Sequence, residues 1–286
     1  MADTQAGATP HFKNPPVVET VLGVQFAPLK NMRVTHYGLL LPHLCEVFSA
    51  PNEQLTKVSE QPPLEPVIEG FDGGALRPPS VQWSVSPAPP LPRCWYTSED
   101  EQFLIQVQPD RLILNWRRQQ DRSGEDPRYA AILDRFLKVY AVFCRFVEDD
   151  DNESFGRVQP NQCEVTYINH INLLDGQNMA ETLDKTLTGW RLATSDGWLT
   201  GAEHGEFATS YAMPNKRGRL HVKAQGAVRR DDGREIIRLS LTARGAPPTP
   251  DAEGVREWLD LGHECVVRGF ASLTTSEMHK RWGRIT

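Results

Sequence analysis

The sequence predicts an α+β fold made of two similar halves, and three observations support this prediction. A strand-like run that opens at residues 15–19 is echoed by a second run that opens at residues 160–164. Farther along the chain, residues 111–117 and 238–244 share the pattern R-L-x-L-x-x-R. A long helix-like stretch follows each copy. Repetition at such intervals indicates a duplicated supersecondary unit, so we expect the halves to pack as a pseudo-symmetric pair.

The first half opens with a strand over residues 17–26, in which one face is apolar and the other carries Glu19 and Gln25. Apolar residues at near-helical spacing then predict a helix over residues 31–48. This part of the chain therefore begins with a strand and a helix.

Residues 49–92 contain many of the prolines, which excludes long helices and leaves room for one short strand over residues 81–85. Alternating patterns next predict three antiparallel strands, and a strongly amphipathic stretch predicts the helix that ends the half. These elements cover residues 94–97, 103–108, 111–118 and, for the helix, 129–148.

The second half repeats this order. The predicted strands cover residues 163–173, 207–213, 219–229 and 235–244, and a short helix covers residues 179–187. Thr249 and Pro250 supply an N-cap and a first-turn proline for a long helix that ends near residue 271. Thr274 and Glu277 have the spacing of a capping box and predict a last short helix.

The resulting order of elements is strand, helix, antiparallel strands and long helix, and it occurs twice. Helices on one face of an antiparallel sheet define an α+β fold. The order resembles the duplicated saddle of the TATA-binding protein and, more loosely, helix-grip ligand-binding domains, and a likeness in element order transfers no function. The predicted organisation is a flexible arm (1–14), a first half (15–149), an acidic linker (150–158) and a second half (159–286).

Composition narrows the class of protein. The chain has a net charge of −6 and therefore lacks the excess of basic residues that a protein needs to bind along a phosphate backbone. We therefore do not expect a nucleic acid as its partner. No apolar run reaches about 18 residues, and the first ten residues have no signal-peptide pattern. Five scattered cysteines do not suggest a disulfide framework. We therefore expect a soluble, cytoplasmic protein that does not enter a membrane.

Strand parity predicts a candidate binding site. Polar and charged residues share the strand faces opposite the apolar ones. If these faces come together, Glu19, Glu164, Arg117 and Arg244 line one shared groove, in which arginine grips a carboxylate or phosphate. The full candidate set is Glu19, Gln25, Arg111, Arg117, Glu164, His170, Arg238 and Arg244.

A simpler interpretation is that these glutamates and arginines pair across neighbouring strands on a solvated sheet face. Such pairs contribute a few tenths of a kcal/mol each, and antiparallel sheets commonly leave one face wet. Similarly, a buried Trp116 between wet arginines explains the run Trp116-Arg117-Arg118 as well as single-strand nucleic-acid binding does.

Metal and cofactor sites are not indicated. The pairs His43/Cys45 and His263/Cys265 point about 200° apart on a helix and have no zinc spacing around them, so a buried helix-face His263 near Phe270 is favoured. No dinucleotide, Walker A or nucleophile-elbow motif occurs. We expect no metal, no cofactor and no catalytic residue.

Two segments resemble a known family. They are Phe12-x-x-Pro15-Pro16-Val17-Val18-Glu19 and Leu261-x-His263-x-x-Val266-x-x-x-Phe270-x-x-Leu273-Thr274, the latter followed by Trp282-Gly283. This pattern is similar to that of a sporadically distributed family of uncharacterised prokaryotic proteins. The resemblance implies no activity and no catalytic residues. Patchy distribution suits genes of mobile or defence systems.

The first functional hypothesis is thus a non-enzymatic binding or adaptor protein that engages a protein partner, encoded nearby, or a polar ligand. The second is an enzyme with a Glu/His/Arg site between the halves, using Glu19, Glu164 and His170. The third is a nucleic-acid-associated defence component. A homodimer is compatible with all three.

Overall fold

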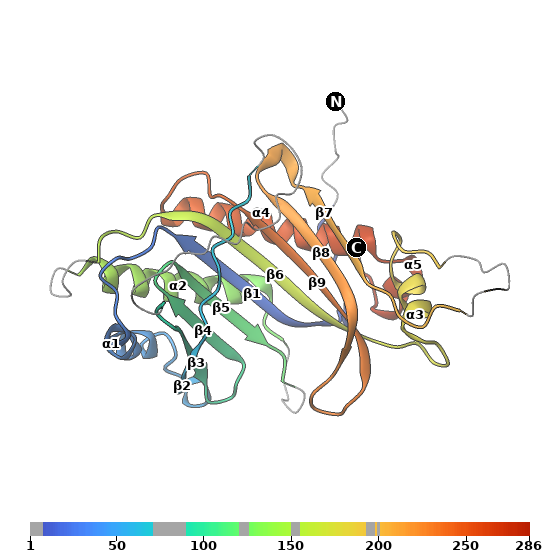
Figure 1. The fold of residues 1–286 in the computed structure, drawn as a ribbon, viewed down its shortest axis with the longest axis horizontal. Coiled ribbons are helices and arrows are strands. Elements are labelled where there is room, and N and C mark those ends of the chain that lie inside the picture. Colours follow the sequence, from blue (N-terminus) through green and yellow to red (C-terminus); the bar gives the residue numbers. More distant parts are fainter. Residues whose placement is uncertain (1–7, 71–89, 120–125, 150–154, 193–197, 199–200) are drawn as a thin grey trace.

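The computed structural model describes residues 8–70, 90–119, 126–149, 155–192, 198 and 201–286. Within them the chain is an α+β protein with one nine-stranded antiparallel sheet, in the order β2-β3-β4-β5-β1-β6-β9-β8-β7 (Figure 1). The strands are β1 Val17–Phe26, β2 Leu55–Gln61, β3 Arg93–Ser98, β4 Phe103–Gln108, β5 Arg111–Arg117, β6 Pro160–Asn172, β7 Phe207–Ala212, β8 Arg219–Val228 and β9 Glu235–Gly245.

Strands from the predicted first half form one side of this sheet and strands from the second half form the other. They meet where β1 pairs antiparallel with β6, in a register that opposes Gly23 to Glu164. β1 also pairs with β5, and β6 with β9. The expected α+β class is confirmed, and the pseudo-symmetry of the halves remains a prediction.

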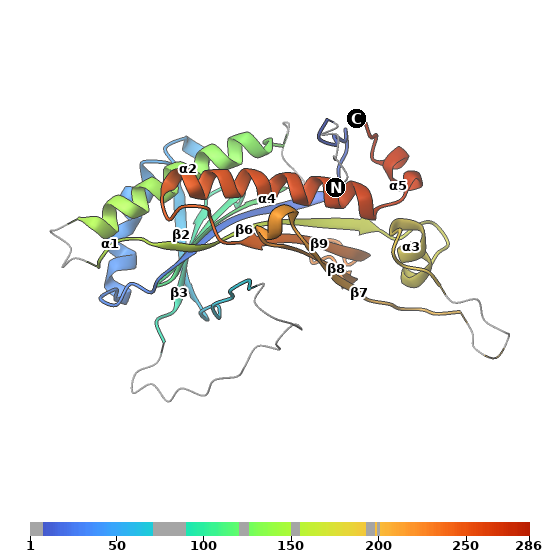
Figure 2. The same ribbon diagram turned by 90° about the horizontal axis from the view of Figure 1, so that it is seen from above.

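The long helices cover one face of the sheet, as the turned view shows (Figure 2). The helices are α1 Val34–Cys45, α2 Tyr129–Glu148, α3 Met179–Thr186, α4 Ala252–Leu273 and α5 Ser276–Arg281. The core lies between this layer and the sheet, and Trp116 from β5, Phe143 from α2 and Trp258 from α4 are buried in it. Burial of such apolar faces is the main force that holds helices on a sheet.

Several predicted boundaries need correction. Strand β2 was not predicted, because its sequence LTKVSEQ is polar and mostly exposed at the sheet edge. Asp251, and not Thr249, caps α4, and its carboxylate accepts the amide of Gly254 at 2.8 Å. Thr275, and not Thr274, caps α5. The strand predicted over residues 81–85 lies outside the described residues.

Both predicted connecting segments contribute to the core where they are described. Phe12, from the predicted flexible arm, is buried against Phe270 and Trp282 near the end of the chain. Phe155 and Val158, from the predicted acidic linker, are buried as well. The described parts of both segments are therefore held against the body of the protein.

Residues 62–70 follow β2 and cross the sheet on the face opposite α2 and α4; we call them the strap (Figures 1 and 2). This face of the sheet is called the polar face below. No helix in the described part of the chain has both the length and the apolar character needed to cross a bilayer.

Candidate functional site

All eight predicted site residues lie on the polar face, but the structure divides them between two hollows. The first, the open groove, is lined by Glu19, Arg117, His170 and Arg238. The second, the strap channel, is lined by Gln25, Arg111, Glu164 and Arg244 together with residues of the strap.

The two hollows lie toward opposite ends of the strands, because β1 and β6 run antiparallel. Glu164 faces Gly23, four residues along β1 from Glu19, a separation of about 13 Å at the rise of a strand. The single groove shared by Glu19 and Glu164 is therefore not formed.

The open groove has a volume of about 1400 Å³. It lies between the β3–β4 turn and the β8–β9 hairpin, at the end of the sheet where β1 begins and β6 ends. Apolar side chains also line it, among them Val18 and Val228, which is 63% exposed. The groove thus offers apolar surface between charged groups.

At one side of the open groove the charges are paired. Arg117 donates to Glu19 across the strands at 3.0 Å, and Asn115 donates to the same carboxylate oxygen at 2.7 Å. Gln106 donates to Asn115 and accepts from Trp95, so the network continues across β4 to β3. This is the cross-strand pairing of the simpler interpretation, and it gives Oε1 of Glu19 two donors.

At the other side of the groove two basic side chains are available. His170 and Arg238 are direct neighbours across β6 and β9, and both are half-buried. Neither side chain has a hydrogen-bond or ion-pair partner among the described residues. Burial, followed by the nearby Arg238 and Arg229, lowers the pKa of His170. These groups can therefore receive an anionic group from outside the chain.

The strap channel differs because the chain itself occupies it. The amides of Leu64, Val67 and Glu69 donate to the side-chain oxygens of Gln108, Gln25 and Gln162, at 3.0, 3.1 and 3.4 Å. Gln108 also donates to the carbonyl of Leu64 at 3.0 Å, and Arg111 donates to that of Glu65 at the same distance. Side chains of the sheet thus bind the main chain of an extended segment.

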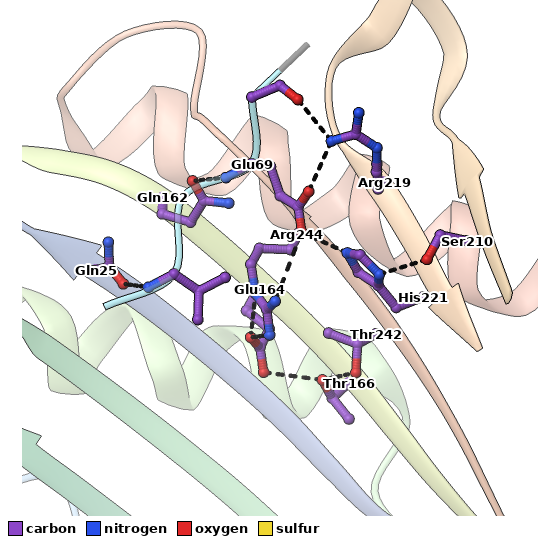
Figure 3. A network of polar contacts seen from close by, with 12 residues as sticks. Gln25, Glu69, Gln162, Glu164, Thr166, Ser210, Arg219, His221, Thr242 and Arg244 are labelled. Carbon is purple, nitrogen blue, oxygen red and sulfur yellow. Dashed lines mark hydrogen bonds and ion pairs between the residues drawn. The ribbon is translucent and has the colours of Figure 1, made fainter. Parts of the chain in front are cut away.

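Glu69 closes this arrangement, as Figure 3 shows. Its side chain is 8% exposed and accepts from Arg219 at 3.1 Å and from His221, with Arg244 at 3.7 Å. Burial raises the pKa of Glu69, but the hydrogen bond from His221, Arg219 and the charge of Arg244 outweigh it, so the pKa is lowered overall. We call this cluster the Glu69 latch.

Beside the latch, Arg244 donates to Glu164 through two nitrogens at 2.8 and 2.6 Å. Thr166 donates to the other carboxylate oxygen at 3.1 Å and contacts Thr242 at 2.8 Å. Glu164 is thus held within the sheet, while Arg244 connects it to the latch.

Sequence reasoning missed the strap, Glu69, Arg219 and His221. Strand parity places Arg219 and His221 on one face of β8 and could have suggested them. Glu69 follows Pro62, Pro63 and Pro66 in a segment with no periodic pattern, so no local signal relates it to β8 and β9.

Ser210, His221 and Glu69 are arranged in the same order as the serine, histidine and carboxylate of a serine hydrolase. Ser210 and His221 Nδ1 are 2.8 Å apart, and His221 Nε2 contacts Glu69. In such enzymes the carboxylate stabilises the imidazolium that forms. Here the charge of Glu69 is already compensated by two arginines. The arrangement is therefore better suited to holding the strap than to catalysis.

His263 of α4 lies between aromatic side chains of α2 and β6. Its ring stacks on Tyr129 at 3.7 Å, and its Nδ1 is 2.9 Å from the hydroxyl of Tyr167. It stacks on Tyr129 and not on Phe270, the neighbour expected from the sequence. Burial lowers the pKa of His263 to about 4, so the ring is neutral. The described residues contain no cluster of three or more metal-binding side chains.

Comparisons with known proteins do not assign this site. No family model and no curated protein matches the chain. One solved structure aligns over most of both chains, the crystal structure of the di-domain ARO/CYC StfQ from the steffimycin biosynthetic pathway. The alignment covers 93% of this chain and 98% of that chain at 8% identity, with a TM-score of 0.19. A similarity this low supports no conclusion about fold or function.

Proposed function

We propose that this protein is a non-enzymatic binding protein that holds an acidic, extended segment of a partner protein in the open groove. The observation that carries the proposal is the pair His170 and Arg238, half-buried on the groove wall and without partners among the described residues. A half-buried arginine that makes no hydrogen bond or ion pair has lost part of its hydration, so a carboxylate that binds Arg238 supplies charge-assisted hydrogen bonds in its place.

The shape of the groove favours a chain segment over a small molecule. Small-molecule sites are enclosed cavities of about 300–1,000 Å³, whereas this open trough is larger, at about 1400 Å³. Val228, which is 63% exposed, and the half-buried Val18 provide apolar surface beside the charges. A peptide that alternates acidic and apolar side chains complements both.

The strap provides a precedent within the same molecule. Side chains of the polar face already bind the main chain of one extended segment and the carboxylate of Glu69. A second segment in the open groove would extend the same mode of recognition. The enzyme hypothesis has less support, because Glu19 and Glu164 are paired with arginines in separate hollows.

Fluorescence anisotropy with a labelled peptide of alternating glutamate and alanine tests the proposal. We expect Arg238→Gln to weaken binding by roughly tenfold or more, because a charge-assisted contact is lost. His170→Gln should weaken it less at neutral pH, since the ring is mostly uncharged there. Arg281→Gln is the matched control, because Arg281 is an exposed arginine of α5 that pairs with Glu277.

Two comparison probes define the outcome. A neutral peptide of equal length should bind more weakly than the acidic peptide, and a single-stranded oligonucleotide should not compete with it. Equal binding of the neutral peptide, or an affinity for the acidic peptide that Arg238→Gln leaves unchanged, would contradict the proposal.

We also propose that the two halves arose by duplication and that the protein acts in the cytoplasm. The first point is supported by the cross-strand pairs Glu19–Arg117 and Glu164–Arg244, which join β1 to β5 and β6 to β9. The second is supported by the five cysteines, which are free thiols and suit a reducing compartment.

A further inference from the structure

The strap is attached to the polar face through a series of polar contacts. None of its residues belongs to the hydrophobic core, and Ile68 is 73% exposed. The contacts that hold the strap are those from Gln25, Gln108, Gln162 and Arg111 to its main chain, and those of the Glu69 latch.

The strap also leaves the channel incompletely filled. A hollow of about 310 Å³ remains between the strap and the sheet, lined by Val67 on one side and by Arg111 and Gln162 on the other. Gln162 Nε2 and Arg111 Nε are buried and have no hydrogen-bond partner in the part of the chain that the structure describes. Buried donors without acceptors cost free energy, so the strap is an imperfect ligand of this channel.

These features make docking of the strap depend on the latch. The conformational entropy lost when the backbone of one strap residue is fixed costs more free energy than one neutral hydrogen bond contributes. Pro62, Pro63 and Pro66 reduce that cost by restricting the unbound segment to extended conformations. The charge-assisted contacts of Glu69 supply the remaining stabilisation. An extended peptide from another protein that carries a glutamate at the same position can make these contacts as well.

We propose that the strap channel is a second binding site, for an extended peptide of a partner protein that carries a glutamate, and that the strap occupies this site within the free protein. Arg219, His221 and Arg244 recognise the glutamate of the incoming peptide. Gln25, Gln108 and Gln162 bind its main chain. A side-chain or main-chain oxygen of the incoming peptide enters the hollow and accepts from Gln162 Nε2 and Arg111 Nε, the two donors that the strap leaves without an acceptor.

A labelled synthetic copy of residues 61–70 is the probe for this site. It should bind the wild-type protein weakly, because the strap competes at high effective concentration. Glu69→Gln weakens the latch within the chain, so this variant should bind the peptide at least roughly tenfold more tightly. Glu65→Gln is the matched control and should behave as wild type, because Glu65 contributes its carbonyl and its side chain is exposed.

The chemistry of recognition is tested from both sides. A probe with glutamine in place of its second glutamate should bind the Glu69→Gln variant roughly tenfold more weakly than the original probe. Adding Arg219→Gln to the variant should produce a similar loss. Binding that does not depend on that glutamate, or a folded Glu69→Gln protein that binds the probe no better than wild type does, would overturn the proposal.

Hydrogen exchange in the wild-type chain provides a measurement that needs no variant. The amides of Leu64, Val67 and Glu69 are hydrogen-bonded to the sheet, and they should lose protection when the probe is added in excess. Amides of β1 and β6 should keep theirs. If the strap amides keep their protection at saturating probe, the probe does not displace the strap, and the proposal is contradicted. His170 and Arg238 lie outside this channel, so the result is independent of the open groove.

Discussion

The strap channel and the open groove are two regions of the same sheet face, and they carry similar groups. Each contains a glutamate paired with an arginine across neighbouring strands, Glu164–Arg244 in the channel and Glu19–Arg117 in the groove. They differ in what meets the remaining donors. In the channel the strap supplies carbonyl groups and the carboxylate of Glu69. In the groove the side chains of His170 and Arg238 make no hydrogen bond or ion pair with a described residue.

This difference shows how a polar sheet face is used in this protein. Cross-strand ion pairs satisfy part of the face locally and contribute little on their own. The hydrogen-bond donors that these ion pairs leave without an acceptor define where another segment binds. In the channel that segment is part of the same chain, and in the groove we propose that it belongs to a partner.

The largest expected effect concerns the core that supports both regions. Trp116 is 2% exposed on β5, on the opposite face from Asn115 and Arg117. Trp116→Ala should cost about 3–5 kcal/mol of unfolding free energy, as large aromatic truncations in cores do. Denaturant unfolding measures this. Trp198→Ala is the control, because Trp198 is 88% exposed, and its cost should stay within about 0.5 kcal/mol. Equal costs would mean that the inner face of β5 is assigned wrongly.

The next largest effect separates the two regions. Glu69→Gln removes a charge that Arg219, His221 and Arg244 surround, so it should cost about 1.5–3 kcal/mol, the range for hydrogen bonds to charged groups. Thermal unfolding and hydrogen exchange of the strap measure it. Binding of the acidic peptide in the open groove should be unchanged. If that binding is lost as well, the two hollows do not act separately.

Acid pH should affect the two regions in opposite directions. The pKa of Glu69 is lowered in the folded protein, so its contribution is present above the unfolded pKa of about 4.3 and is lost as pH falls through the folded value. Protection of the strap amides should therefore stay constant near neutral pH and decrease as the pH falls below about 4.3. Hydrogen exchange between about pH 6 and pH 3 checks this.

In the open groove, acid should strengthen binding. The pKa of His170 is lowered in the free protein by burial, Arg238 and Arg229, against the opposing charges of Asp231 and Glu19. A bound carboxylate raises that pKa, so affinity for the acidic peptide should increase a few-fold as pH falls from about 7 to about 5. His170→Gln should abolish this increase, while Arg281→Gln should keep it. A wild-type affinity that is flat over this range would exclude His170 from the site.

The smallest effect tests whether the two ion pairs act on one site. Glu19→Gln and Glu164→Gln should each cost less than about 1 kcal/mol of stability, because both pairs are partly exposed. Since the two glutamates lie in different hollows, their effects on peptide binding should be additive in a double-mutant cycle. Non-additive effects would restore the single shared groove that the sequence suggested.

Most of the sheet could be predicted from the sequence, because its signals are local. The alternation in residues 103–108 and 111–118 predicted β4 and β5, and the amphipathic stretch at residues 129–148 predicted α2. Boundaries set by capping groups were less well predicted, since several nearby residues have side chains that can cap. Asp251 accepts the amide of Gly254, and the hydroxyl of Thr249 donates to Asp251 instead of capping the helix. The edge strand β2 was missed because it has no apolar face.

By itself, the sequence determined which side chains share a strand face, since the two-residue period of a strand is a local property. This was sufficient to place Glu19, Gln25, Glu164 and His170 on one polar face. The tertiary structure alone decided that β1 pairs with β6 in antiparallel orientation, which separates Glu19 from Glu164. It also decided that Glu69 lies against β8 and β9, a contact between residues about 150 positions apart in the chain. Such contacts depend on how the whole sheet assembles, and no local pattern encodes them.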